Sequence, residues 1–264
     1  MKLFDSHCHL DFDAFAIDRK DVIARALNAG VRAIFVPGVS RQQSVNNARS
    51  DDNQWPGDCA GVTLLQGFGL HPYFIQQHHD DDLQWLAQQL ESNPTAAVGE
   101  IGLDACCEDY AIQTRLFTAQ VDLACEFQRP VVIHHRKTQP ELLRVLKQAR
   151  NKLPEYPGVI HAFSGSKEQA NAWIELGFML GIGGTITYDR ASKTRAAVAQ
   201  AKLSHLLLET DAPDMPISGY QGQRNEPAHC SDVVRVLAEL RDESTEELAV
   251  ATWNNACRLF RWHG

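Results

Sequence analysis

The stretch LFDSHCH, residues 3–9, places a short apolar strand directly before a pair of histidines. An open, doubly wound sheet that binds a nucleotide typically carries a glycine-rich turn after its first strand. Here that turn holds His7, Cys8 and His9 instead. The stretch therefore favours a closed barrel, in which the chemistry stands where the strands end.

The same unit, a short apolar strand followed by a helical pattern, recurs eight times along the 264 residues. Strands that are buried on both faces read as nearly continuous apolar runs, which is typical of a parallel sheet covered by helices. Eight such units predict an α/β fold, a (β/α)₈ TIM-type barrel of parallel strands with outer helices. We expect the strands at residues 3–8, 33–36, 64–68, 97–101, 131–134, 159–162, 178–182 and 206–209.

Helical patterns lie between these strands. Apolar residues recur at the i, i+3, i+4, i+7 spacing within residues 83–90, behind the acidic residues 80–82, which we expect to cap that helix. A second apolar stripe covers residues 112–127 and is ended by Pro130. The pattern of residues 233–260 predicts two closing helices.

The composition is that of a globular protein, with 44% hydrophobic and 22% charged residues. No linker divides the chain, so we expect a single barrel domain over residues 1–264. No apolar run approaches the roughly 18 residues that span a membrane. The first residues, MKLFDSH, lack the apolar stretch of a secretory signal, and together these features predict a cytoplasmic protein.

The cysteine count and the net charge limit which cellular compartment and which binding partners are expected. Seven cysteines form an odd count without any CxxC pair, which argues against a disulfide framework and favours free thiols in a reducing cytoplasm. The formal net charge is −8 without a lysine or arginine block, so a broad basic face for duplex nucleic acid is not expected. A local anion pocket, neutralised by metal ions, stays open. Nothing in the sequence indicates an obligate protein partner.

Ionisable side chains finish most of the expected strands. Side chains alternate along a strand, so the histidines of the HCH stretch point to one face and Cys8 to the other. One such pair on its own is equally well explained by hydrogen bonds to its neighbours. Because burying several ionisable groups together without a cation is costly, the whole set favours a metal site. The set consists of His7, His9, Glu100, His134, His161 and Asp211.

Six ligands are more than one ion needs. Four imidazoles and two carboxylates suit two divalent ions bridged by a carboxylate, and Glu100 is the natural bridge. Imidazole with carboxylate suits zinc, manganese or iron, and magnesium is less expected from the histidines but stays open. One ion is expected on His7, His9 and Asp211, and the other on His134 and His161.

A centre of this kind implies hydrolysis. Two divalent ions polarise a substrate oxygen and lower the pKa of a bound water, so that the water can attack at neutral pH. We expect Asp211 and Glu100 to be the catalytic residues, the first because one of its oxygens can accept the proton of that water. Activated water attacks phosphorus and carbonyl carbon alike, so the ligand set does not choose between a phosphodiester and an amide or ester.

Other residues near the strand ends are candidates for binding the substrate. Arg136 can clamp a phosphate, or form a salt bridge with a barrel carboxylate. His71 can contact the substrate or a carboxylate of the site, or stand in water. Asp104 can orient a ligand or cap a loop, and Ser164 is a further candidate. His135 alternates away from its neighbour and is expected to pack, but it would replace that neighbour if the register slipped by one residue.

Several blocks of the chain resemble the TatD family of metal-dependent hydrolases and deoxyribonucleases, and together they cover nearly its whole length. This resemblance implies a TIM-like barrel, a two-metal centre and hydrolysis of phosphodiesters in DNA. It places the metal ligands on the same six residues. The blocks are DSHCHLD (5–11), GLHP (69–72), GEIGLD (99–104), PVVIHHR (130–136), HAFSGS (161–166), IGG (182–184), LETDAP (208–213) and NEP (225–227).

Three places depart from the family pattern. The aromatic residue that commonly follows GEIGLD is Ala105 here, and the frequent histidine after the HP pair is Tyr73. The frequent arginine before the NEP block is replaced around residues 221–224. All three lie in loops expected to rim the site, so they bear on the substrate rather than on the chemistry.

The sequence thus predicts a deoxyribonuclease that cleaves from a strand end, on single-stranded or frayed DNA. One alternative is an amidohydrolase-like enzyme or an aminoacyl-ester deacylase with the same centre. Another is a barrel whose metal is structural and whose mouth binds a partner without turnover.

Overall fold

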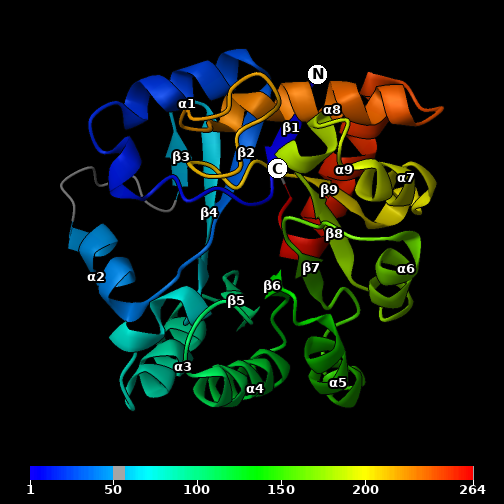
Figure 1. Cartoon of the computed structure of the whole chain (residues 1–264). Coiled ribbons are helices and arrows are strands. Elements are labelled where there is room, and N and C mark those ends of the chain that lie inside the picture. Colours follow the sequence, from blue (N-terminus) through cyan, green and yellow to red (C-terminus); the bar gives the residue numbers. More distant parts are fainter. Residues whose placement is uncertain (50–56, 264) are drawn as a thin grey trace.

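The computed structural model describes residues 1–49 and 57–263. Eight parallel strands form a nearly closed barrel, and the helices are arranged around it (Figure 1). The predicted (β/α)₈ fold is therefore confirmed. In barrel order the strands are β1 (Leu3–Asp5), β2 (Val31–Val36), β4 (Val62–Phe68), β5 (Ala97–Asp104), β6 (Val131–Arg136), β7 (Gly158–Ile160), β8 (Met179–Ile182) and β9 (Leu206–Leu208).

The barrel closes between its first and last strands. The Ser6 N–H donates to the Leu208 carbonyl at 2.8 Å, and Cys8 pairs with Ala212 in a parallel bridge. One short strand, β3 (Gly57–Cys59), pairs antiparallel with β4 outside this ring, and the sequence did not predict it.

The helices alternate with the strands, as predicted. Residues 80–82 act differently from the expected cap: Asp81, at the helix start, makes no capping bond, whereas Asp82 accepts a hydrogen bond from the His79 N–H at 2.9 Å. The helices are α1 (Arg19–Asn28), α2 (Arg41–Arg49), α3 (Asp82–Ser92), α4 (Tyr110–Glu126), α5 (Gln139–Ala149), α6 (Lys167–Glu175), α7 (Ser192–Gln200), α8 (Cys230–Leu240) and α9 (Thr245–Phe260).

Several strand ends differ from the sequence prediction by one to three residues. β5 runs on to Asp104 and β6 to Arg136, and the two strands pair up to these residues with one shift in register after Val98. β1, β7 and β9 instead end early, so that His7, His161 and Asp211 lie in the loops that directly follow. The site is thus built partly on strands and partly on the first residues of βα loops.

Two apolar layers hold the barrel together. One lies between the strands and the outer helices, and the other fills the barrel interior with Phe4, Phe35 and their neighbours. Helix α9 closes the end of the barrel where the strands begin, because its Phe260 stacks on Phe35 with ring centroids 4.3 Å apart. The opposite end, where the strands finish, is therefore the one left for chemistry.

Within the described residues, no helix combines the length and the apolar character needed to cross a bilayer.

Candidate metal centre

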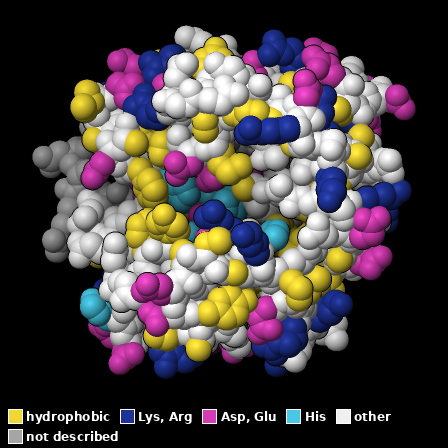
Figure 2. All heavy atoms as spheres, in the orientation of Figure 1, with side chains coloured by type: hydrophobic (Ala, Val, Ile, Leu, Met, Phe, Trp, Pro, Cys, Tyr) yellow, Lys and Arg dark blue, Asp and Glu magenta, His cyan; other side chains and the backbone are white. Residues whose placement is uncertain are grey.

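The six predicted ligands converge at the end of the barrel where the strands finish. Five of them line a pocket of about 600 Å³, and His7 is fully buried directly beside it. Figure 2 shows this pocket as a hollow with histidine side chains at its base, acidic side chains on one side and basic side chains on another. The strand-end prediction thus placed all six side chains in one site.

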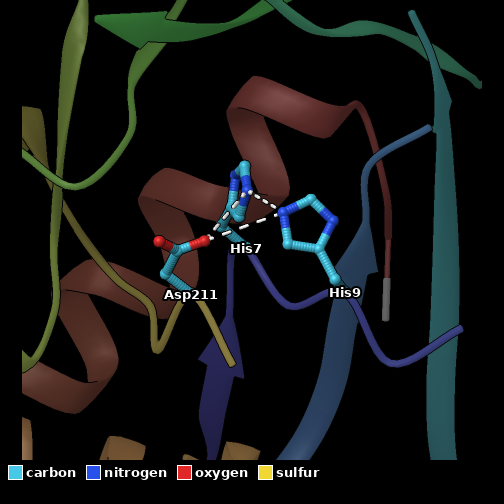
Figure 3. A group of neighbouring side chains, drawn as sticks. All are labelled: His7, His9 and Asp211. Carbon is cyan, nitrogen blue, oxygen red and sulfur yellow. Dashed lines mark hydrogen bonds and ion pairs between the residues drawn. The ribbon is translucent and has the colours of Figure 1, made fainter. Parts of the chain in front are cut away.

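The first group of donors is formed by His7, His9, Asp211 and one oxygen of Glu100. His7 Nε2 lies 3.3 Å from His9 Nε2 and 3.6 Å from Asp211 Oδ1, and Figure 3 shows the three side chains turned toward one another. Glu100 Oε2 lies 3.2 Å from His7 Nε2 and 3.3 Å from His9 Nε2. Donors that bind a zinc-sized ion at about 2.0–2.2 Å in a tetrahedron lie about 3.3–3.6 Å apart. These distances fit one divalent ion.

Local backbone geometry turns these side chains toward one point. His7 and His9 share a face because one residue separates them in an extended segment. Asp211 has a φ of 58°, a left-handed conformation that an aspartate tolerates, and its N–H donates to the His7 carbonyl at 2.9 Å. The buried Asp5 accepts hydrogen bonds from the His7 N–H and from the N–H and hydroxyl of Thr210. These hydrogen bonds therefore hold the segment after β1 against the segment after β9, directly beneath the donor side chains.

The second group consists of His134, His161 and the other oxygen of Glu100. Glu100 Oε1 lies 2.7 Å from His161 Nε2 and 3.1 Å from His134 Nδ1. The two imidazole nitrogens are 3.4 Å apart. The residues expected on a second ion therefore face one oxygen of Glu100, and those expected on the first ion face the other.

Glu100 is the centre of the arrangement. It is 1% exposed, and burial alone would raise its pKa, but the surrounding imidazoles of His161, His71 and His7 hold that pKa well below its usual value. Gly102, two residues on, has a φ of 155°, and a Cβ there would stand 2.0 Å from the His134 carbonyl. This close approach requires glycine and sets β5 directly beside the strand that carries the second group.

His71, predicted as a substrate contact, is buried and touches Glu100. Its Nε2 lies 3.0 Å from Glu100 Oε1, and its Nδ1 accepts the Tyr73 N–H at 3.0 Å. Burial lowers the pKa of His71 to about 4, so the ring is neutral at pH 7 and carries its proton on Nε2. His71 is thus a donor to the carboxylate, which excludes the alternative of a loop histidine in water.

Asp104 lies behind the second group. Its Oδ2 is 3.2 Å from His134 Nε2, and its Oδ1 accepts the Cys106 N–H at 2.7 Å. Burial would raise the pKa of Asp104, but the hydrogen bonds of His134 and Cys106 lower it to about 2. A carboxylate on the far nitrogen of an imidazole fixes its orientation, so Asp104 orients the ring of His134, and its role toward a metal or a substrate stays a prediction.

The remaining candidates stand at the wall and rim of the pocket. His135 turns away from the donors and lies 6.2 Å, ring to ring, from Trp173. Arg136 is exposed at the rim, and no carboxylate of the described residues comes within ion-pair distance of it. Ser164 also lines the pocket, and its hydroxyl lies 3.4 Å from the hydroxyl of Thr194. Their roles toward a substrate stay predictions.

Glu209 was not predicted as a site residue, although the sequence places it at the end of a strand. It is fully buried, its Oε1 accepts the Ala162 N–H, and its Oε2 has no partner among the described residues. It forms a third potential ligand group with His7 and His161. Gly181 makes room for it, since a Cβ there would lie 1.9 Å from Glu209 Oε2. Burial raises the pKa of this carboxyl to about 8.

Aromatic side chains form another part of the wall that the sequence did not single out. Phe12, Tyr73 and Phe74 line the pocket, and the Phe12 ring stacks on His9 at 4.5 Å. Tyr73 is 66% exposed at the entrance. These rings are scattered over two loops, so no local pattern marks them as one surface.

Neither the Cys8 thiol nor the Cys107 thiol has the properties of a catalytic nucleophile. Cys8 is fully buried, and burial raises the pKa of its thiol well above the usual value. The thiol of Cys107 also has a raised pKa, chiefly through burial. A nucleophilic cysteine needs a lowered pKa, so neither of these two thiols is activated for attack.

Comparison with known proteins points to one family. The sequence model described as TatD related DNase matches residues 4–261. The chain is 43% identical to "Uncharacterized metal-dependent hydrolase YjjV" of Escherichia coli K12 over 263 residues, which cover 98% of each protein.

Two further likenesses extend this result. The crystal structure of YjjV, a TatD homologue from Escherichia coli K12, superposes with a TM-score of 0.90 at 42% identity, covering 99% of this chain and 98% of that one. A more distant relative, named 3′-5′ ssDNA/RNA exonuclease TatD, from Pectobacterium parmentieri, is 30% identical over 98% of this chain and 99% of its own length.

Proposed function

The chain belongs to the TatD related DNase family and is a metal-dependent hydrolase, and we propose that it is a nuclease that uses two divalent ions to cleave single-stranded DNA from a strand end. A relative 30% identical carries the name of a 3′-5′ ssDNA/RNA exonuclease, which supports this choice over an amide or ester. The proposal keeps the barrel as one domain. It also keeps the enzyme in the cytoplasm, in line with seven cysteines that form no CxxC pair.

One observation carries the proposal of two ions. The two oxygens of Glu100 face different donor groups, Oε2 toward His7 and His9 and Oε1 toward His134 and His161. A single ion would not be coordinated by donor groups that face different oxygens of one carboxylate. A carboxylate that bridges two ions about 3.5–4 Å apart uses both of its oxygens in this way.

Ions held by these donors supply Lewis-acid chemistry, lowering the pKa of a coordinated water and stabilising charge on a phosphate. Asp211 directs Oδ1 to the first donor group, while its second oxygen points away from His7 and His9 (Figure 3). Burial raises the pKa of Asp211, which makes its carboxylate a better proton acceptor. Asp211 therefore takes the proton of the attacking water.

Residues at the rim of the pocket recognise the substrate. Arg136 has no carboxylate partner among the described residues and lies at the pocket wall, so its guanidinium is free to bind a phosphate oxygen. Phe12, Tyr73 and Phe74 offer ring faces on which an unstacked base can pack. The net charge of −8 makes the molecule as a whole repel nucleic acid. We therefore expect the end of a single strand to enter the pocket, and not a duplex to bind along its side.

The experiment compares two aspartates of the same pocket. Asp211→Asn is matched by Asp214→Asn, since Asp214 lines the rim and is not among the proposed ligands. Both are assayed, after loading with manganese, magnesium or zinc, on oligonucleotides labelled at either end and on a panel of esters and amides.

We expect cleavage of single-stranded DNA by the wild-type enzyme, beginning at the 3′ end. Loss of the proton acceptor should lower kcat in Asp211→Asn by about 10²–10⁴-fold, and Asp214→Asn should retain the wild-type rate within a few fold. Turnover of esters or amides without cleavage of any nucleic acid would contradict the proposal. Full metal occupancy without turnover of any substrate would instead favour a binding module.

A further inference from the structure

A second, smaller pocket opens beside the metal centre. It has a volume of about 220 Å³ and shares two lining residues, Thr185 and Met215, with the larger pocket. Its other walls come from Tyr188, Arg190 and Pro216, with Ala191. The two pockets therefore lie side by side and share Thr185 and Met215 as lining residues.

The tyrosine of this side pocket is held in place. Its hydroxyl donates to the Pro216 carbonyl at 2.7 Å, which ties the loop before α7 to the loop that follows Asp211. The guanidinium carbon of Arg190 lies 4.8 Å from the centre of the Tyr188 ring, within the range of a cation–π contact. Ring and guanidinium are thus presented together at fixed positions.

The charge of Arg190 is not paired with a carboxylate of the described residues. Among the residues that the structure describes, no carboxylate lies within ion-pair distance of its guanidinium. The adjacent Asp189 is paired instead with Arg195, at 3.6 Å. Of the residues that line the side pocket, Arg190 alone is charged, and most of the others present apolar surface.

A pocket with one unpaired cation, a fixed aromatic ring and apolar walls suits a ligand that combines an anion with a flat ring. A nucleotide is such a ligand. We propose that the side pocket binds the second nucleotide of a single strand whose terminal nucleotide lies at the metal centre, with Arg190 on its phosphate and its base against the Tyr188 ring. This inference rests on the proposed nuclease function and extends it to a substrate of at least two nucleotides.

The test uses the metal-loaded enzyme and two substrates of different length. A labelled hexathymidylate spans both pockets, whereas bis(4-nitrophenyl) phosphate reaches only the metal centre. Arg190→Ala is compared with Arg190→Lys and with the control Arg235→Ala, in which an arginine 64% exposed on α8 is removed. Tyr188→Phe removes only the tether to Pro216.

We expect Arg190→Ala to lower kcat/KM for the hexanucleotide by about tenfold, through KM, because phosphate and base contacts in single-strand grooves have this magnitude. Its turnover of the small diester should equal that of the wild type. The slope of log kcat/KM against log salt should fall by about 0.7 when one phosphate contact is lost. Arg190→Lys should retain part of the affinity, Tyr188→Phe should show a smaller loss, and Arg235→Ala should show none.

The outcomes separate the two proposals. Equal kcat/KM of Arg190→Ala and wild type on the hexanucleotide would overturn the side-pocket proposal and leave the nuclease standing. A wild-type enzyme that binds the hexanucleotide in fluorescence anisotropy without cleaving it, with binding weakened by Arg190→Ala, would support the side pocket and overturn the nuclease. A wild-type enzyme that neither binds nor cleaves it would overturn both.

Discussion

His71 Nε2 lies 3.0 Å from Glu100 Oε1 and donates to it, because the other nitrogen of the ring is occupied by the Tyr73 N–H. The carboxylate between the two donor groups is thus oriented by a neutral imidazole from the loop after β4. A hydrogen bond to a bridging carboxylate fixes its rotation and keeps its two oxygens aimed at two different groups.

This contact makes His71→Ala informative. Without the donor, Glu100 gains rotational freedom, and we expect the affinity for the more weakly held ion to fall by about 10–100-fold. His71→Asn, which keeps an N–H donor, should recover part of it. The check is a metal titration with His79→Ala as control, since His79 is exposed on the neighbouring loop. Unchanged affinity in His71→Ala would show that the contact is incidental.

Two adjacent histidines test the register of β6. His134 faces Glu100 and His161, whereas His135 packs toward Trp173. We expect His134→Ala to lower the metal content of the purified protein and His135→Ala to leave it unchanged, as measured by inductively coupled plasma mass spectrometry. Equal loss of metal in both variants would contradict the register.

An ion-pair cluster away from the site predicts a pH-dependent part of the stability. Asp18 accepts hydrogen bonds from Arg224 and Arg25, and both arginines also bind Glu226, which joins α1 to the chain before α8. The Arg224 hydrogen bond, with that of Arg25, lowers the pKa of Asp18 to about 2, below the value of about 3.9 in an unfolded chain.

A lowered folded-state pKa means that the stabilisation is complete above the unfolded pKa and is lost as pH falls through the folded one. Asp18→Asn should therefore lower the Tm at pH 7. The difference in Tm from the wild type should shrink as pH falls from about 4 to 2. A difference that stays constant over this range would show that the carboxylate charge is not responsible.

Substitutions at the closed end of the barrel should lower the stability of the fold without changing its metal content. Phe35 is 1% exposed and stacks on Phe260 of α9, so Phe35→Ala leaves a cavity, and the free energy of unfolding should fall by about 3–5 kcal/mol. Denaturant titration measures the loss. Val250→Ala, at an exposed position of the same helix, should change the free energy by less than about 0.5 kcal/mol. Metal content should be equal in all three proteins.

The sequence predicted the barrel and the convergence of six ionisable side chains because both depend on local periodicity. A strand that ends in a polar residue can be recognised within a few positions, and in a parallel barrel all strand ends of one kind meet. That His7 and His9 point to the same face followed from the alternation of side chains along an extended segment alone. That is why strand ends wrong by one to three residues still placed the six side chains in one site.

Contacts between distant segments were beyond that reasoning. His71 and Glu100 are 29 residues apart, and only the closed barrel shows that the loop after β4 reaches the carboxylate of β5. Glu209 precedes Asp211 by two residues, and the folded barrel buries it close to His7 and His161. Its full burial, and an Oε2 without a partner among the described residues, depend on these distant segments and leave no local pattern in the sequence.

The most direct measurement is anomalous diffraction from crystals loaded with manganese. The account predicts two peaks about 3.5–4 Å apart, one on each side of Glu100, the first beside His7, His9 and Asp211 and the second beside His134 and His161. A single fully occupied peak, or two peaks that share no oxygen-bearing side chain, would contradict it.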